Sequence, residues 1–243
     1  MSVLVVTGGA RGIGAAICRR AARDGFDVVV NYARDEAAAA AVVREVEALG
    51  RRGLAVRADV ADEDEVAALF TAADALGPLT GLVANAGITG DTPGRLDQQS
   101  AATVRRVLDV NVTGVFLCLR EAVRRMSGRG GAIVTISSTA AHRGSPGEWA
   151  HYAASKAAVE TLTYGLAQEV AGEGIRVNVV APGLVNTDLH SAAGMPDRPA
   201  RLASRIPLGR AGEPEEIAEG VVWLLSPAAS FVTGAVLPIS GGF

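Results

Sequence analysis

Cysteine, aromatic residues and long apolar runs are scarce in this sequence of 243 residues. Its two cysteines, Cys18 and Cys118, each lie in an apolar stretch typical of a helix, which indicates buried free thiols in a reducing compartment rather than a disulfide framework. No apolar run reaches the ~18 residues that a membrane span needs, and no basic leader follows Met1. We therefore expect a cytoplasmic protein without a membrane partner.

The sequence also lacks an excess of charge of one sign. Its 23 basic and 26 acidic side chains give a net charge of -3 and are interspersed along the chain, so no basic stripe is available for nucleic acid. The three histidines do not have metal-ligand spacing, and we expect no metal site. Trp149, His142, His151 and His190 are instead candidates for the wall of a substrate pocket or for surface positions.

Hydrophobic residues make up 49% of the chain, which suffices for one compact domain over residues 1–243. Short runs rich in β-branched residues predict buried strands. These runs are Val3–Thr7, Asp27–Tyr32, Leu54–Arg57, Gly81–Ala84, Ala132–Ser137, Arg176–Ala181 and Ala235–Ile239. Between them, segments with apolar residues three and four positions apart predict helices. These segments are 12–24, 35–49, 62–76, 100–126, 151–172 and 213–226.

The alternation of strands and helices along the whole chain predicts the fold class α/β. Parallel strands joined by helical crossovers form a Rossmann-type doubly wound sheet, here of about seven strands, with helices on both faces. The longest irregular stretch is 189–212, which is rich in proline and glycine. It is either a substrate loop or a plain surface excursion.

A glycine-rich turn follows the first predicted strand and leads directly into a helix. It reads Thr-Gly-Gly-Ala-Arg-Gly-Ile-Gly over residues 7–14. Gly8, Gly12 and Gly14 allow the backbone to approach a ligand closely, and the amides around Ile13 begin the helix. The context of strand, turn and helix predicts a site for the pyrophosphate of a dinucleotide.

The end of the second predicted strand indicates which dinucleotide is bound. A carboxylate there would accept hydrogen bonds from a free ribose 2′-hydroxyl, but this chain has Asn31 followed by Tyr-Ala and Arg34. Arg34 and Arg11 would instead offer positive charge to a 2′-phosphate. NADP(H) is therefore the expected cofactor, although Arg34 could also be a solvated residue paired with Asp35 or Glu36.

Tyr152 and Lys156 stand four positions apart on a predicted helix and so share one face. A phenol titrates near pKa ~10, and a neighbouring ammonium together with an oxidised nicotinamide would bring it toward the working pH of a general base. The preceding strand ends at Ser138, at the sheet edge where open α/β folds bind their ligands. Ser138 could hydrogen-bond a substrate carbonyl oxygen.

Taken in order, these motifs and several others resemble the short-chain dehydrogenase/reductase family over essentially the whole chain, including members that act as 3-oxoacyl-acyl-carrier-protein reductases or glucose dehydrogenases. The motifs are the glycine turn at 7–14, Asp59-Val60, Asn85-Ala86-Gly87, Asn111, Ser138, Tyr152-Ala-Ala-Ser-Lys156 and Pro182-Gly183. The resemblance implies an oxidoreductase that interconverts a carbonyl and an alcohol by hydride transfer.

The same resemblance implies a role for each site residue. Tyr152 would be the proton donor and acceptor, Ser138 would steady the substrate oxygen, and Asn111 would hold a water of the proton relay. Lys156 would lower the pKa of Tyr152 and bind the nicotinamide ribose. The other implied cofactor contacts are Asp59 and Val60 at the adenine, Asn85, Ala86 and Gly87 at the central strand, and Pro182, Gly183, Val185 and Thr187 at the nicotinamide.

Two departures from the family pattern leave alternatives open. Tyr152 follows Ser138 by fourteen residues where thirteen is commoner in the family. The catalytic hydroxyl could therefore be that of Thr139, although we favour Ser138. Glu173 stands where carrier-protein reductases have a basic residue and would repel an acidic carrier, although Arg124, Arg125 and Arg129 offer a basic edge nearby. A thioester, a sugar and other small carbonyls all remain candidate substrates.

The resemblance further implies a homotetramer or homodimer, formed through the helices predicted at 100–126 and 151–172 and through the last helix and strand. The apolar chain end, residues 231–243, fits burial in such an interface. The competing hypothesis is a dinucleotide-binding sensor or structural subunit without turnover, because a fold does not fix a function.

Overall fold

The structure, a computed structural model, describes residues 2–90 and 92–243, apart from the side chain of His190. Its seven strands form one sheet, in which every neighbouring pair is parallel. The strands are β1 (Ser2–Val6), β2 (Phe26–Tyr32), β3 (Gly53–Arg57), β4 (Leu79–Ala84), β5 (Gly131–Ile136), β6 (Ile175–Pro182) and β7 (Val236–Ile239). Their order is β3-β2-β1-β4-β5-β6-β7, which confirms the predicted doubly wound sheet.

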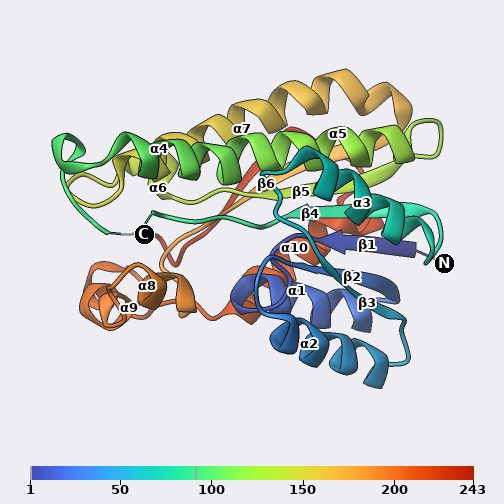
Figure 1. The fold of residues 1–243 in the computed structure, drawn as a ribbon, viewed down its shortest axis with the longest axis horizontal. Helices are drawn as coiled ribbons and strands as arrows, with labels where there is room; N and C mark the ends of the chain where they lie inside the picture. Colours follow the sequence, from blue (N-terminus) through green and yellow to red (C-terminus); the bar gives the residue numbers. More distant parts are fainter. Residues whose placement is uncertain (1, 91) are drawn as a thin grey trace.

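Helices cover both faces of this sheet (Figure 1). On one side lie α1 (Gly12–Arg23), α2 (Glu36–Ala48) and α10 (Pro214–Leu225), and on the other lie α3 (Glu63–Asp74), α4 (Ala101–Leu108), α5 (Gly114–Met126) and α7 (Ala150–Val170). Three short helices, α6 (Ala140–Arg143), α8 (Asp188–Ala192) and α9 (Arg198–Leu202), follow the carboxyl ends of β5 and β6. Within the described residues, no helix has both the length and the apolar character to cross a bilayer.

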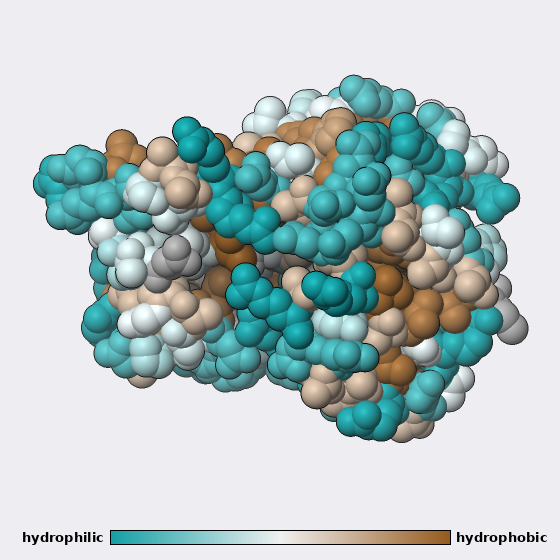
Figure 2. Space-filling view, in the orientation of Figure 1, coloured by the Kyte–Doolittle hydropathy of each residue, from teal (hydrophilic) through white to brown (hydrophobic). Residues whose placement is uncertain are grey.

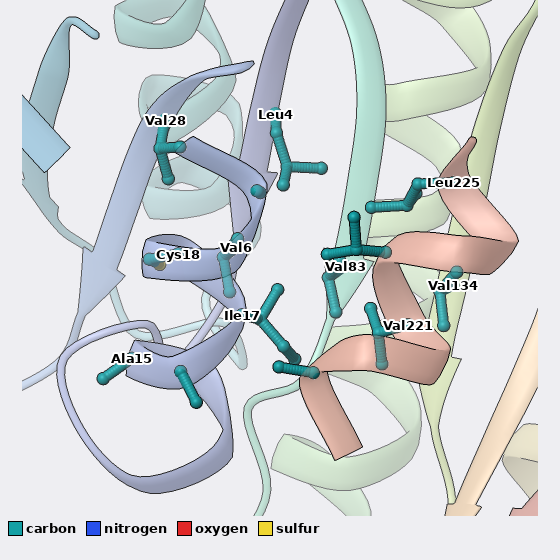
Figure 3. Close-up of a cluster of buried hydrophobic side chains, with 14 of the residues drawn as sticks. Leu4, Val6, Ala15, Ile17, Cys18, Val28, Val83, Val134, Val221 and Leu225 are labelled. Atoms are coloured by element: carbon teal, nitrogen blue, oxygen red, sulfur yellow. The ribbon is translucent and has the colours of Figure 1, made fainter. Parts of the chain in front are cut away.

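Alternate residues of the strands supply the two halves of the core. On β1, Leu4 and Val6 pack with α1 and α10, and Figure 3 shows Leu4, Val6, Ile17 and Val221 in this cluster. Val3 and Val5 belong to the other cluster, with residues of α3, α5 and α7. Because side chains alternate along a strand, this doubly apolar pattern fits the position of β1 inside the sheet, between β2 and β4.

The helices differ in how they begin. Asp35, Asp62 and Ser100 accept hydrogen bonds from amides of the first turns of α2, α3 and α4, as N-cap side chains commonly do. α1 begins after Arg11 without a side-chain cap. Its first amides are therefore left for a ligand, at the carboxyl edge of the sheet.

Two segments depart from the sequence-based expectations. The helix predicted over 100–126 is interrupted by a π-helical turn, Asp109–Thr113, and such turns are frequent at functional sites. Gly114, which follows the turn, lies so close to Val60 that an added Cβ would stand 2.8 Å from its side chain. The segment 189–212, predicted as irregular, holds the end of α8, all of α9 and a 3-10 turn, Ala203–Arg205.

Candidate functional site

The glycine turn between β1 and α1 has a backbone that side chains would disrupt. Gly8 and Gly12 have φ values of 60° and 51°, in the left-handed region that favours glycine. A Cβ on Gly14 would collide with the Gly8 carbonyl oxygen and stand 2.7 Å from Asn85 Nδ2. Gly14 therefore allows the start of α1 to pack closely against Gly8 and Asn85, and Ile13 packs against the core.

Polar side chains hold this turn to its neighbours. Asn31 Oδ1 accepts a hydrogen bond from the Gly8 amide at 3.2 Å, while Asn31 Nδ2 donates to the Ala58 carbonyl at 3.0 Å. Asn85 Nδ2 donates to the Thr7 and Gly8 carbonyls at 2.9 and 3.1 Å. Asn85, an implied cofactor contact, and Asn31, at the strand end where the ribose of the cofactor is expected, thus shape the turn through hydrogen bonds within the chain.

Thr7 is a residue of this site that the sequence analysis did not single out. Its hydroxyl oxygen accepts hydrogen bonds from the Asn85 and Ala86 amides at 2.9 and 3.0 Å. The ends of β1 and β4 are thereby fixed to each other. The sequence does carry a signal for Thr7, because it places a hydroxyl at the last position of a predicted buried strand, directly before the glycine turn.

The part of the site where we expect the adenosine of the cofactor lies beyond the ends of β2 and β3. The Asp59 carboxylate receives a hydrogen bond from Arg106 at 2.7 Å and another from the Ala61 amide at 3.0 Å. Burial raises the pKa of this carboxyl, but the two hydrogen bonds and the charges of Arg106 and Arg34 outweigh it, so the pKa lies below its ordinary value. Val60 is buried beside it.

A further guanidinium stands at the same strand ends. Arg57 is paired with Tyr32 in the β2–β3 register, and its Nε donates to the Ala33 carbonyl at 3.4 Å. Arg34 and Arg11 are exposed. The carboxyl ends of β1, β2 and β3 thus offer positive charge where the 2′-phosphate was predicted.

The structure brings the predicted catalytic side chains together. Lys156 is 3% exposed, and its Nζ lies 5.7 Å from the centre of the Tyr152 ring. Burial raises the pKa of the Tyr152 phenol above its ordinary value, and a hydrogen bond from Ser138 and the charge of Arg198 act in the opposite direction. Burial lowers the pKa of Lys156 to about 8. Ser138, rather than Thr139, is the hydroxyl at Tyr152.

Asn111 occupies the π-helical turn and is fully buried. Its Oδ1 accepts from the Ile88 amide at 2.9 Å, and its Nδ2 donates to the Ile88 carbonyl at 2.8 Å and to Ser155 Oγ at 2.9 Å. A Cβ on Gly87 would stand 3.2 Å from Lys156 Nζ and 3.4 Å from Asn111 Oδ1. Gly87 therefore keeps the space between these two side chains open.

The expected nicotinamide end follows β6. Pro182 pairs with Ile239 on β7, and the Gly183 amide donates to the Ile239 carbonyl at 3.0 Å. Val185 is buried. A Cβ on Gly12 would stand 3.4 Å from Thr187 Cγ2, so the segment after β6 reaches the glycine turn.

The candidates for the pocket wall divide into different environments. His151 is buried, with Nε2 2.9 Å from the Thr89 carbonyl oxygen, whereas the exposed His142 pairs with Glu160 at 3.2 Å. Trp149 is buried against Arg198. The side chain of His190 lies outside the described part of the chain. Figure 2 shows hydrophobic residues in a hollow between the two helical layers, bordered by hydrophilic ones.

Comparisons with known proteins agree with this geometry. The profile of a family described as enoyl-(acyl carrier protein) reductase matches residues 8–243. The uncharacterized oxidoreductase YgfF of Escherichia coli (strain K12) is 48% identical over 247 residues, covering 100% of both chains. The cis-4-hydroxycyclohexanecarboxylate dehydrogenase of Sinomonas cyclohexanicum is 46% identical over 244 residues, covering 99% of this chain and 96% of that protein.

A solved structure is similar over nearly the whole chain as well. A short chain dehydrogenase from Burkholderia cenocepacia J2315, in complex with NADP, has a TM-score of 0.92 at 38% identity, covering 98% of this chain and 96% of that chain. Fold and relatives together define an oxidoreductase that depends on a nicotinamide dinucleotide. More particularly, the chain belongs to the short-chain dehydrogenase/reductase family. The predicted family, fold class and enzyme class are confirmed, while the roles of individual residues stay predictions.

Proposed function

We propose that this protein interconverts a carbonyl and an alcohol with NADP(H), and that Tyr152 is its general acid and base. The observation that carries the proposal is the convergence of Tyr152, Ser138 and Lys156 at the carboxyl edge of the sheet. The segment after β6 reaches the glycine turn, because a Cβ on Gly12 would stand 3.4 Å from Thr187 Cγ2. A donor is thus held where negative charge would develop on a substrate oxygen.

The glycine turn fits the pyrophosphate of a dinucleotide, because glycine at positions 8 and 12 leaves its backbone without side chains and α1 starts without a side-chain cap. When bound, the dinucleotide supplies or accepts a hydride. Arg11 and Arg34, with Arg57 beside them, would hold the 2′-phosphate through charge-assisted hydrogen bonds. Asp59 and Val60 would border the adenine, and Pro182, Gly183, Val185 and Thr187 the nicotinamide.

During carbonyl reduction, Tyr152 would give its phenolic proton to the substrate oxygen, and during alcohol oxidation its phenolate would take that proton back. Ser138 would donate a hydrogen bond to the same oxygen. Lys156 would bind the ribose and favour the phenolate, and Asn111 would hold a water that returns the proton from solvent. Positioning of the two reactants and acid catalysis together would account for most of the rate.

The substrate is proposed to be a small carbonyl compound enclosed by the segment 189–212. Two of the three arginines of the basic edge considered for a carrier protein are engaged within the chain: Arg124 and Arg125 bind Glu121 at 2.8 and 2.7 Å. Charge available for an acidic carrier is reduced accordingly. The Sinomonas relative is named for an alcohol on a small ring, which also supports a compact substrate.

We further propose that the chain forms a homotetramer. Exposed apolar side chains lie in two groups, namely Leu108 and Phe116 on α4 and α5, and Trp223, Phe231 and Val236 around α10 and β7, with Tyr164 of α7 beside Gly234. Two such groups on one subunit allow two kinds of twofold contact. Light scattering coupled to size exclusion tests this directly, and a monomer at micromolar concentration would contradict it.

The function is tested by fluorescence titration with NADPH and NADH, followed in the same cuvettes by a carbonyl panel. The panel contains a 3-oxoacyl thioester, several sugars and cyclohexanone. Tight NADPH binding with oxidation by one substrate class would support the proposal. Binding without any turnover would instead favour a sensor.

Two variants sharpen this test. Tyr152→Phe should bind NADPH normally but lose orders of magnitude in turnover, because only the proton donor is removed. The double variant Arg11→Ala/Arg34→Ala should lose the preference for NADPH over NADH. An unchanged preference in the double variant would show that the charge argument is wrong.

A further inference from the structure

Arg198 on α9 is held by a carboxylate from a distant part of the chain. Its side chain is 13% exposed, and its Nη2 and Nε lie 2.7 and 3.3 Å from the two oxygens of Glu148. Two parallel contacts to one carboxylate fix the plane of a guanidinium as well as its position. This ion pair joins the segment 189–212 to the stretch just before α7.

Trp149 supplies a second contact for the same guanidinium. The Arg198 Cζ lies 5.4 Å from the centre of the Trp149 ring, within the range of a cation–π interaction. Trp149 is buried, and its carbonyl accepts a hydrogen bond from the Ala153 amide at 3.0 Å. Arg198 is therefore seated against the first turn of the helix that carries Tyr152, at the end of the molecule where α8 and α9 lie (Figure 1).

Other charged and titratable groups occur on the elements packed around this part of α7. They are His151, Lys156 and Glu160 on α7, His142 and Arg143 on α6, Glu148 before α7, Arg105 and Arg106 on α4, Asp109 on the π-helical turn, and Arg198 on α9. Most of those nearest the start of α7 are engaged elsewhere. His142 pairs with Glu160, Arg143 lies 3.7 Å from the centre of the Phe243 ring, and His151 faces the Thr89 carbonyl.

We propose that Arg198 is a positioning residue through which the substrate loop takes part in proton transfer, because the seating of α9 on Glu148 and Trp149 places a positive charge against the first turn of α7, the helix that carries Tyr152. This inference rests on the proposed function of Tyr152 as acid and base. The Arg198 charge lowers the pKa of Tyr152, against the larger effect of burial. Glu148 moderates that charge, since the pair as a whole is neutral.

The consequence for the reaction follows from acid–base catalysis. A catalytic group works best when its pKa lies near the working pH, and burial alone would leave the phenol protonated. The Arg198 cation makes the phenolate easier to form while α9 is held on Glu148 and Trp149. The loop then contributes to chemistry as well as to enclosure of the substrate.

The test uses two variants that break the same ion pair but change the local charge in opposite senses. Arg198→Gln removes the cation, and Glu148→Gln leaves the cation without its counter-charge. The titration of Tyr152 is read from the near-ultraviolet absorbance of tyrosinate in the protein with NADP⁺ added. Subtracting the same titration of a Tyr152→Phe protein in each background removes the signals of Tyr32 and Tyr164.

We expect the Tyr152 titration to move to higher pH in Arg198→Gln and to lower pH in Glu148→Gln. Arg198→Lys retains the charge and should keep the wild-type midpoint. A purely structural latch would shift both glutamine variants in the same direction or leave both unchanged, and either outcome would overturn the inference. If Arg198→Gln does not fold, Glu148→Gln still decides, because an upward shift or no shift contradicts the role of the charge.

The titration also separates this inference from the proposed function. It needs no turnover, so a wild-type protein inactive on the whole carbonyl panel would refute the enzyme while the absorbance still reports on Arg198. Conversely, an active enzyme with unshifted midpoints in both glutamine variants would keep the function and refute the inference.

Discussion

The Lys156 ammonium nitrogen donates a hydrogen bond of 2.7 Å to the carbonyl oxygen of Ile136, the last residue of β5. This contact anchors the side chain of α7 to the end of a central strand. Lys156 is also the only lysine in the sequence, among 23 basic side chains. A buried lysine is unfavourable for folding, because burial penalises its charged form.

Replacing Lys156 by methionine should therefore stabilise the protein at neutral pH while it removes activity. The fall of the lysine pKa from 10.5 to about 8 corresponds to a cost of about 3 kcal/mol for burying the charged side chain. The variant removes this cost but also loses the hydrogen bond to Ile136, which contributes about 1 kcal/mol of stability. We expect Lys156→Met to raise the free energy of unfolding in urea at pH 7 by about 2 kcal/mol.

The sign of the pH dependence follows from the lowered pKa. Between about 8 and 10.5, the unfolded chain binds more protons at Lys156 than the folded chain does, so wild-type stability rises with pH in that window. The advantage of Lys156→Met should shrink from pH 7 to pH 10. Because there is one lysine, a ¹³C-lysine NMR signal measures the pKa directly, and a midpoint near 10.5 would contradict the argument.

A second prediction concerns the glycine turn. Gly14→Ala places a Cβ against the Gly8 carbonyl and 2.7 Å from Asn85 Nδ2, where overpacking typically costs about 2–3 kcal/mol. We expect a lower melting temperature and loss of NADPH binding. Gly172→Ala is the matched control, because nothing lies within 4 Å of its added Cβ and it should change neither quantity.

Much of the fold could be predicted because its signals are local. The β-branched runs predicted every strand to within two residues of its observed ends. The inner strands are buried on both faces, so few polar residues interrupt their pattern, and only the edge strands β3 and β7 are more exposed. Helical spacing placed Tyr152 and Lys156 on one face, and the strand end at Ser138 together with the family resemblance indicated their roles. The resemblance to a family was needed for Asn111, whose partners lie in other elements.

The remaining features could not be predicted because they depend on tertiary packing. The π-helical turn at 109–113 has the same spacing of apolar residues as a regular helix, and the close approach of Gly114 to Val60 appears only in the folded chain. The pairing of Arg198 with Glu148 spans fifty positions of sequence. Neither residue has a local pattern that indicates the other.

The two cysteines give a simple test of the packing. Burial raises the pKa of the Cys118 thiol to about 12 and raises that of Cys18 further, so the reactive thiolate is almost absent near neutral pH. We expect an aromatic disulfide reagent to label neither cysteine in the native protein at pH 8 and to label both after unfolding in guanidinium. Rapid labelling of the native protein would show that one of the two clusters is more open than described.

The last prediction concerns Arg57, which the sequence analysis did not propose as a cofactor ligand. Its guanidinium lies where the ends of β2 and β3 meet, bonded to the Ala33 carbonyl next to Arg34. If it holds part of the 2′-phosphate, Arg57→Ala should weaken NADPH binding about tenfold, because one charge-assisted hydrogen bond contributes about 1.5 kcal/mol. NADH binding should not change, because NADH has no phosphate there.

Added salt should narrow the difference in NADPH affinity between wild type and the Arg57→Ala variant. Arg23→Ala, an exposed arginine at the opposite end of α1, controls for net charge, and an equal effect of both variants would mean that Arg57 acts only through the overall field of the protein.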